Sequence, residues 1–230
     1  MTITLFLVLA GCAALLCIPL RMQMRWYGVK PLQSVFISLT IIVTGYIGSK
    51  LWFFLENGKW DGLSFFGAIY LSPFAFWLAA KWLRMEYLHA LDFCATAGCF
   101  VLALLKIQCL MDGCCGGMIL FLNDEHMYVR FPSQIVEFTT ALILAGSMLA
   151  LSYKEKNRKK IYPITLVSYG SLRFVLNLFR DDWDRAHEMG LFLPIGCIWA
   201  IMAVVIGAIW LVTDWRKQKN ARQSYPSSVE

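Results

Sequence analysis

The sequence predicts an all-α integral membrane protein with about seven transmembrane helices, and three observations favour this fold class. Hydrophobic residues make up 59% of the 230-residue chain and charged residues only 16%, whereas a soluble domain carries about 25% charged residues. Seven stretches approach the roughly 20 apolar residues that a membrane-spanning helix needs. Aromatic residues reach 15%, with nine Trp, a composition typical of the aromatic belts at membrane interfaces.

The predicted spans follow one another without an internal repeat or a linker, at 2–20, 33–55, 64–82, 90–111, 133–152, 161–180 and 190–213. The first lacks the basic start and the small-residue cleavage site of a signal peptide, so we interpret it as a helix that stays. The sixth is the weakest because it contains Arg173. We expect residues 1–214 to form a single polytopic membrane domain and residues 215–230 a polar, loose cytoplasmic tail.

The distribution of Lys and Arg predicts the orientation. Segments that follow odd-numbered spans carry 14 of these residues, and segments that follow even-numbered spans carry 4. Because positively charged loops stay in the cytoplasm, the N-terminus is expected outside and the C-terminus in the cytoplasm.

Four ionisable residues lie in the predicted outer halves of the spans: Lys50, Lys106, Glu137 and Arg173. A charge at membrane depth costs about 2.5–3.5 kcal/mol on insertion scales, so such residues tend to face a polar cavity. We therefore expect one cavity that opens outward. Two structural alternatives stay open: Lys50 and Lys106 extend to the interface, or Arg173 and Glu137 form a structural ion pair.

The cations of this region suit a phospholipid headgroup. Arg binds phosphate oxygens in pairs through its planar fork, and Lys adds a point charge; the candidates are Lys106, Arg130, Arg173 and Arg180. The sequence contains no Walker A loop, G-x-S-x-G elbow or H-E-x-x-H motif. No metal-ligand spacing of Cys and His is present. We expect no metal, no cofactor and no nucleic-acid partner.

Six segments occur in an order that is similar to one known family. The chain resembles the prolipoprotein diacylglyceryl transferases of the bacterial inner membrane through RWYG (25–28), GLSFFG (62–67), LDF (91–93), KIQCLMDGCCGG (106–117), RFPSQIVEF (130–138) and YGSLRFVLNLFRDD (169–182). The resemblance implies seven spans with the N-terminus outside. It also implies transfer of the diacylglyceryl group of phosphatidylglycerol to the lipobox cysteine thiol of a preprolipoprotein, with glycerol 1-phosphate as by-product.

The resemblance also implies roles for individual residues. Arg173 and Arg180 would hold the phosphate with help from Lys106, and Glu137 together with Gln134 would position them. The substrate-binding candidates are Tyr27, Ser64, Asp112, Arg130 and Gln134.

The chain departs from the family pattern in the residues that would handle protons. Phe66 stands where the family has His, Lys106 where it has Arg, and Asn177 where it has Glu. The catalytic base is therefore open, and His126 is one candidate. Cys114 and Cys115 are either structural or a reactive pair. The acceptor is open too: alternatives are a related phosphatidylglycerol-dependent transferase with another acceptor, a non-catalytic lipid-binding or scaffold protein, or a small transporter.

Overall fold

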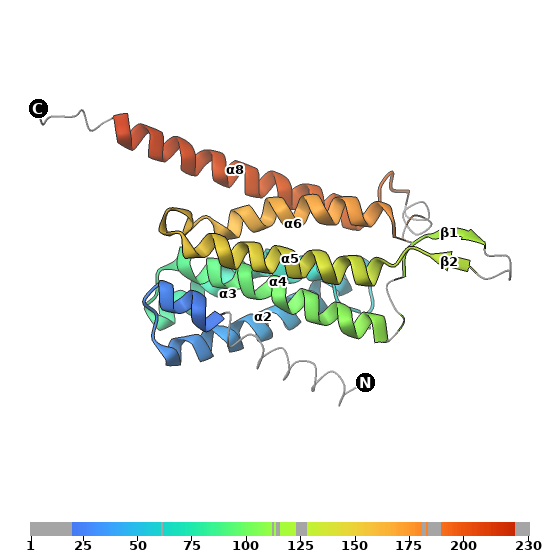
Figure 1. Ribbon diagram of the computed structural model, residues 1–230, viewed down its shortest axis with the longest axis horizontal. Coiled ribbons are helices and arrows are strands. Elements are labelled where there is room, and N and C mark those ends of the chain that lie inside the picture. Colours follow the sequence, from blue (N-terminus) through green and yellow to red (C-terminus); the bar gives the residue numbers. More distant parts are fainter. Residues whose placement is uncertain are drawn as a thin grey trace, which may run out of the picture.

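The computed structural model describes residues 20–60, 62–111, 113, 116–122, 128–180, 183 and 190–223. The described chain is a bundle of long helices with a short β-hairpin at one end (Figure 1). The elements are α2 (Pro31–Asn57), α3 (Phe65–Leu83), α4 (Tyr87–Met111), β1 (Ile119–Leu122), β2 (Tyr128–Arg130), α5 (Ser133–Tyr153), η1 (Glu155–Asn157), α6 (Ile161–Leu178) and α8 (Ile195–Gln223). The closest packing joins α2 to α3, α4 to α5, and α6 to α8.

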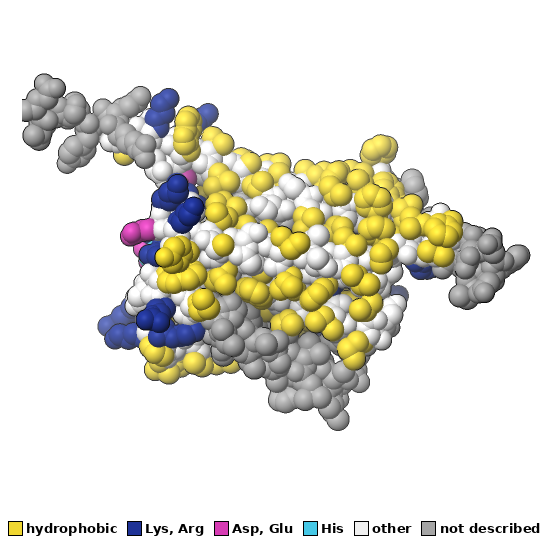
Figure 2. All heavy atoms as spheres, viewed as in Figure 1, with side chains coloured by type: hydrophobic (Ala, Val, Ile, Leu, Met, Phe, Trp, Pro, Cys, Tyr) yellow, Lys and Arg dark blue, Asp and Glu magenta, His cyan; other side chains and the backbone are white. Residues whose placement is uncertain are grey.

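The prediction of an all-α integral membrane protein is confirmed. Five of the described helices, α2, α3, α4, α5 and α8, are long and apolar enough to cross a membrane. The predicted span at 161–180 coincides with α6, and the span at 2–20 lies outside the described residues apart from Leu20. Exposed apolar side chains cover the flanks of the bundle, while Lys and Arg gather at the end away from the hairpin (Figure 2).

Two local features differ from the sequence prediction. Strands β1 and β2 pair antiparallel in a segment expected to be loop; apolar and β-branched residues in both strands favour the pairing. Helix α8 continues to Gln223, so the first part of the tail predicted to be loose is helical. Its Lys, Arg and Gln residues are good helix formers, and the Gln218 amide donates to Asp214 one turn earlier at 2.8 Å.

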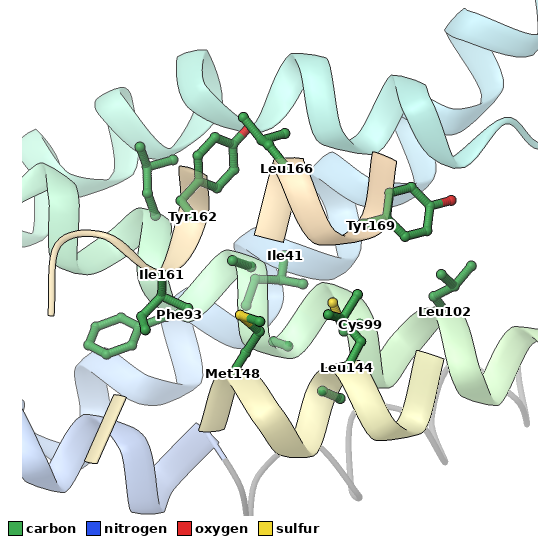
Figure 3. Close-up of a cluster of buried hydrophobic side chains, with 14 of the residues drawn as sticks. Ile41, Phe93, Cys99, Leu102, Leu144, Met148, Ile161, Tyr162, Leu166 and Tyr169 are labelled. Atoms are coloured by element: carbon green, nitrogen blue, oxygen red, sulfur yellow. The ribbon is translucent and has the colours of Figure 1, made fainter. Parts of the chain in front are cut away.

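Apolar side chains from several helices fill the middle of the bundle (Figure 3). Glycines allow the helices to approach closely, as is usual in membrane bundles. A Cβ on Gly48 of α2 would lie 2.7 Å from the carbonyl oxygen of Gly67 in α3, and one on Gly170 of α6 would lie 2.8 Å from that of Ala200 in α8. These contacts fix α6, which carries Arg173, against α8.

A buried carboxylate fixes the start of α6 at the end of the bundle away from the hairpin. Asp92 of α4 is 0% exposed. It accepts hydrogen bonds from the backbone N–H groups of Lys159 at 2.6 Å, Ile161 at 3.0 Å and Tyr162 at 3.3 Å. The Tyr27 hydroxyl donates a fourth at 2.8 Å. Asp92 therefore accepts hydrogen bonds from backbone N–H groups that have no partner within the helix at the N-terminus of α6. All four of these donors are neutral.

Candidate active site

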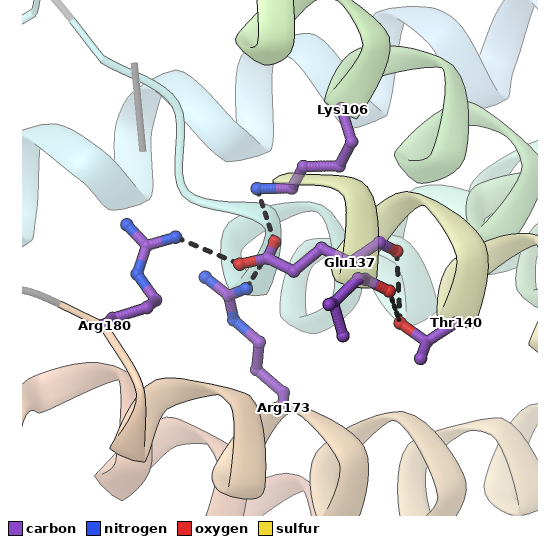
Figure 4. Close-up of polar contacts among 6 residues, drawn as sticks. Lys106, Glu137, Thr140, Arg173 and Arg180 are labelled. Atoms are coloured by element: carbon purple, nitrogen blue, oxygen red, sulfur yellow. Dashed lines mark hydrogen bonds and ion pairs between the residues drawn. The ribbon is translucent and has the colours of Figure 1, made fainter. Parts of the chain in front are cut away.

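Four of the residues predicted from the sequence meet near the hairpin end of the bundle (Figure 4). The Lys106 ammonium of α4 and the Arg173 guanidinium of α6 each lie 2.6 Å from Oε2 of Glu137 in α5. The Arg180 guanidinium, just beyond α6, lies 3.2 Å from Oε1 of the same carboxylate. The predicted gathering of these residues is present in the structure.

This cluster carries more positive than negative charge. Three cations surround one carboxylate, so the four side chains carry two excess positive charges. Glu137 is only 4% exposed and Lys106 only 10%. The hydroxyl of Thr140, the neighbouring polar residue on α5, donates to the backbone carbonyl oxygen of Val136 at 2.7 Å and not to the Glu137 carboxylate. Among the described residues, the partners of that carboxylate are therefore the three cations. Such an excess of buried positive charge favours the approach of an anionic group.

The alternatives for the two lysines now have different outcomes. Extension of Lys106 to the interface is wrong, because its ammonium is buried and paired with Glu137. Lys50 does not join the cluster: its ammonium donates to the carbonyl oxygen of Trp60 at 2.6 Å. The alternative ion pair between Arg173 and Glu137 is present, although two further cations share the same carboxylate.

The hairpin brings a further cation toward the cluster. The backbone of Gly117, just before β1, pairs with that of Arg180, and the Arg130 guanidinium on β2 lies 3.5 Å from the Gly117 carbonyl oxygen. Gln134 lies three residues before Glu137 on α5, and residues at this spacing share one helix face.

Ser64 lies at the same end of the bundle as the cluster, whereas Tyr27 does not. The Ser64 hydroxyl donates to Oε1 of Glu56 at 3.3 Å, and Glu56 interacts electrostatically with Arg173. Tyr27 binds Asp92 at the opposite end of the bundle; the 14 helical residues from there to Lys106 span about 21 Å. The structure therefore places Tyr27 at the opposite end of the bundle from the cavity that it was expected to line.

Four candidates, Asp112, Cys114, Cys115 and His126, lie outside the described residues. Phe66 is 4% exposed and stacks against Tyr70, with ring centroids 6.2 Å apart. It fills the apolar core and supplies no proton-transfer group.

The structure adds residues that the sequence analysis missed. Glu56 lies in the last turn of α2. It is beside two tryptophans, Trp52 of the same helix and Trp199 of α8, and the ring centroids of these two tryptophans are 4.9 Å apart. Both indole N–H groups are buried close to the Glu56 carboxylate without reaching good hydrogen-bond geometry. The available signal is an acidic residue that directly follows the predicted span at 33–55.

Comparison with known proteins agrees with this arrangement. The family model for prolipoprotein diacylglyceryl transferase matches residues 3–213. The chain belongs to the prolipoprotein diacylglyceryl transferase family. A relative from Acinetobacter baumannii, named phosphatidylglycerol–prolipoprotein diacylglyceryl transferase, is 27% identical over 214 residues, covering 80% of this chain and 78% of its own.

Relatives of the same name occur in other bacteria. The one from Polaromonas naphthalenivorans is 26% identical over 173 residues, covering 70% of this chain and 63% of its own. The one from Acinetobacter baylyi is 26% identical over 197 residues, covering 76% and 72%. Membership in the diacylglyceryl transferase family confirms the resemblance drawn from the six sequence segments.

Proposed function

We propose that this membrane protein is a transferase that moves the diacylglyceryl group of phosphatidylglycerol to the cysteine thiol of a preprolipoprotein. The names of its relatives indicate both the lipid donor and the protein acceptor. The observation that carries the proposal is the buried excess of positive charge around Glu137. Such a site is suited to a phosphate group, whose negative charge grows as it leaves.

The cavities beside the cluster support an amphiphilic donor. An apolar cavity of about 70 Å³ lies between α2, α3, α4 and α6, and Tyr169 forms part of its wall. Tyr169 also lines the small pocket that contains Glu137 and Arg173. A phospholipid has the same division, with an anionic headgroup joined to apolar chains.

The chain's own residues would act on the headgroup side of the reaction. The thiolate sulfur attacks the glyceryl carbon, the carbon–oxygen bond to phosphate breaks, and the electron pair leaves on a phosphate oxygen. Arg173 and Arg180 hold that oxygen through their forks, and Lys106 adds a point charge. Glu137 keeps the three cations at one place, and Gln134, Arg130 and Ser64 lie where they can contact the rest of the headgroup or the acceptor.

The proposal places the site on the outer side of the bacterial inner membrane. The charge bias of the sequence supports this orientation, because the Lys- and Arg-rich loops lie at the end away from the cluster. A lipobox cysteine that reaches the outer leaflet would then meet the anionic headgroup of phosphatidylglycerol.

Mass spectrometry of one reaction mixture tests the proposal. The detergent-purified protein is incubated with phosphatidylglycerol and a peptide that contains a lipobox cysteine; the control peptide has serine in place of cysteine. We expect a diacylglyceryl adduct on the cysteine peptide alone, with release of glycerol 1-phosphate. Consumption of phosphatidylglycerol without a peptide adduct would favour another acceptor, and no consumption would favour the non-catalytic alternative.

A further inference from the structure

We infer that Glu56 is the catalytic base that removes the proton from the acceptor thiol. The inference rests on the proposed function, because it concerns the nucleophile of that reaction. A cysteine thiol has a pKa of about 8.5 and attacks as the thiolate, so at neutral pH the reaction gains from a group that accepts the proton.

The buried carboxylate of the cluster cannot serve as this base. Both oxygens of Glu137 are engaged by cations at 2.6 to 3.2 Å, and protonating it would remove the negative charge that all three cations share. The geometry around Glu137 therefore suits a carboxylate that stays ionised throughout the reaction. The aromatic ring of Phe66, at the position where a histidine was expected, offers no basic atom.

Glu56 has the properties that Glu137 lacks. It is half-buried, and among the described residues no cation lies within 4.0 Å of its carboxylate, whereas Glu86 binds Lys159 and Asp214 binds Lys160. Its hydrogen-bond partner is the neutral Ser64 hydroxyl at 3.3 Å. Such a carboxylate can accept a proton without disrupting an ion pair.

The position of Glu56 relative to Arg173 joins the two halves of the reaction. Arg173 pairs with Glu137 and also interacts electrostatically with Glu56. Packing brings Glu56 and Arg173 to the same level of the bundle. Trp52, one turn before Glu56, contacts Trp199 of α8 with ring centroids 4.9 Å apart. Ala200, next to Trp199, packs against Gly170, about one turn before Arg173. We therefore expect a phosphate held by Arg173 to lie in the same region as Glu56. Among the described residues, the charged group that acts on Glu56 from the neighbouring elements is Arg173 of α6; α8 presents Trp199, and the segment before α3 presents Ser64.

The proposed step balances as a simple substitution. The thiol proton passes to a Glu56 carboxylate oxygen, and the sulfur forms a bond to the glyceryl carbon. The bond between that carbon and the phosphate oxygen breaks, and its electron pair leaves with glycerol 1-phosphate beside Arg173. Glu56 then releases the proton to water at the site entrance.

The test compares Glu56→Gln with Glu155→Gln, a matched change at an exposed carboxylate far from the site. Transfer to the lipobox peptide is measured from pH 6 to about pH 9, beside thermal midpoints in detergent. General base catalysis contributes about 10²- to 10⁴-fold, so E56Q should lose at least 100-fold in kcat at neutral pH. The loss should shrink near the thiol pKa, where the thiolate forms unaided.

A peptide with selenocysteine in place of cysteine provides the second measurement. Its selenol is more acidic than a thiol and is already ionised at neutral pH, so E56Q should transfer to it nearly as well as the wild type. Glu56→Asp, which keeps a carboxylate, should retain part of the thiol activity and the same pH profile if E56Q does not fold.

The outcomes separate this inference from the function on which it rests. If the wild type and E155Q form no adduct, the proposed function fails and the assignment of Glu56 fails with it. If the wild type forms the adduct and E56Q matches it within threefold at neutral pH, the inference alone is overturned. A loss that is equal at every pH and with both nucleophiles would also overturn it, because Glu56 would then only position Arg173.

Discussion

Two buried carboxylates at opposite ends of the bundle have opposite surroundings. Asp92 is 0% exposed and Glu137 is 4% exposed, and each lies in a long apolar helix. Asp92 accepts hydrogen bonds from three backbone N–H groups and a tyrosine hydroxyl. Glu137 instead has two guanidinium groups and an ammonium around it.

We interpret the difference as that between a structural site and the proposed binding site. Four neutral donors bind the Asp92 carboxylate, and the result is a fixed junction between α4 and the start of α6. The cations around Glu137 exceed what one carboxylate needs, although every buried charge has a desolvation penalty. An excess of this kind favours the binding of an anionic group, which is the property that the proposed transfer from a phospholipid requires.

The largest effect is expected from Glu137→Gln. Removing one partner of a buried ionic network costs about 3–5 kcal/mol, since three cations then lose the carboxylate that they share. The thermal midpoint should fall sharply, and added inorganic phosphate, which would replace the lost carboxylate charge, should raise the midpoint of the variant more than that of the wild type. A midpoint that does not respond to phosphate would argue against an anion site.

A smaller loss is expected at the opposite end from Asp92→Asn. The amide keeps one acceptor oxygen but turns its NH₂ toward backbone donors, and an unsatisfied buried group costs about 1–3 kcal/mol. The free energy of unfolding should fall by this amount, while turnover per folded molecule and the response to phosphate stay unchanged. Selective loss of turnover with normal stability would place Asp92 in the reaction instead.

The smallest effect on activity is expected from Phe66→His. The ring lies among Tyr70 and Tyr169 in the core, so the imidazole would have no contact with the acceptor thiol. With Glu56 as base, turnover of the lipobox peptide should not increase. A clear gain in turnover would show that position 66 can reach the chemistry and would weaken the role given to Glu56.

Much of the fold could be predicted from the sequence because the bilayer imposes a simple rule. Apolar runs of about 20 residues become helices, and the six predicted spans from 33–55 onward coincide with helices of the structure. The β-hairpin and the helical continuation of α8 were missed because strand pairing and helix propensity in polar segments act outside the lipid, where hydropathy carries no signal.

The site could be predicted in part for the same reason. Lys106, Glu137 and Arg173 interrupt apolar helices, and their penalty in lipid marks them as residues that must meet. The same argument could not predict whether Tyr27 and Glu56 lie near this site. Tyrosine is tolerated at either membrane interface, and an acidic residue at the end of a span has almost no penalty, so only the structure reveals their partners, which are Asp92 of α4 for Tyr27 and Ser64 for Glu56.

Turnover of phosphatidylglycerol by Arg173→Lys tests the central claim most directly. Lysine keeps the charge beside Glu137 but loses the paired geometry of the guanidinium fork. A hydrogen bond to a charged group contributes about 1.5–3 kcal/mol, so turnover should fall roughly 10- to 150-fold at about 1.4 kcal/mol per decade.

The thermal midpoint of the same preparation separates binding from stability. We predict that the midpoint of Arg173→Lys stays within a few degrees of the wild type, because the ammonium can still pair with Glu137, while phosphatidylglycerol consumption falls by the stated factor. Full consumption by the lysine variant would contradict the account, because Arg173 would then be a structural partner of Glu137 and not a ligand of the phosphate.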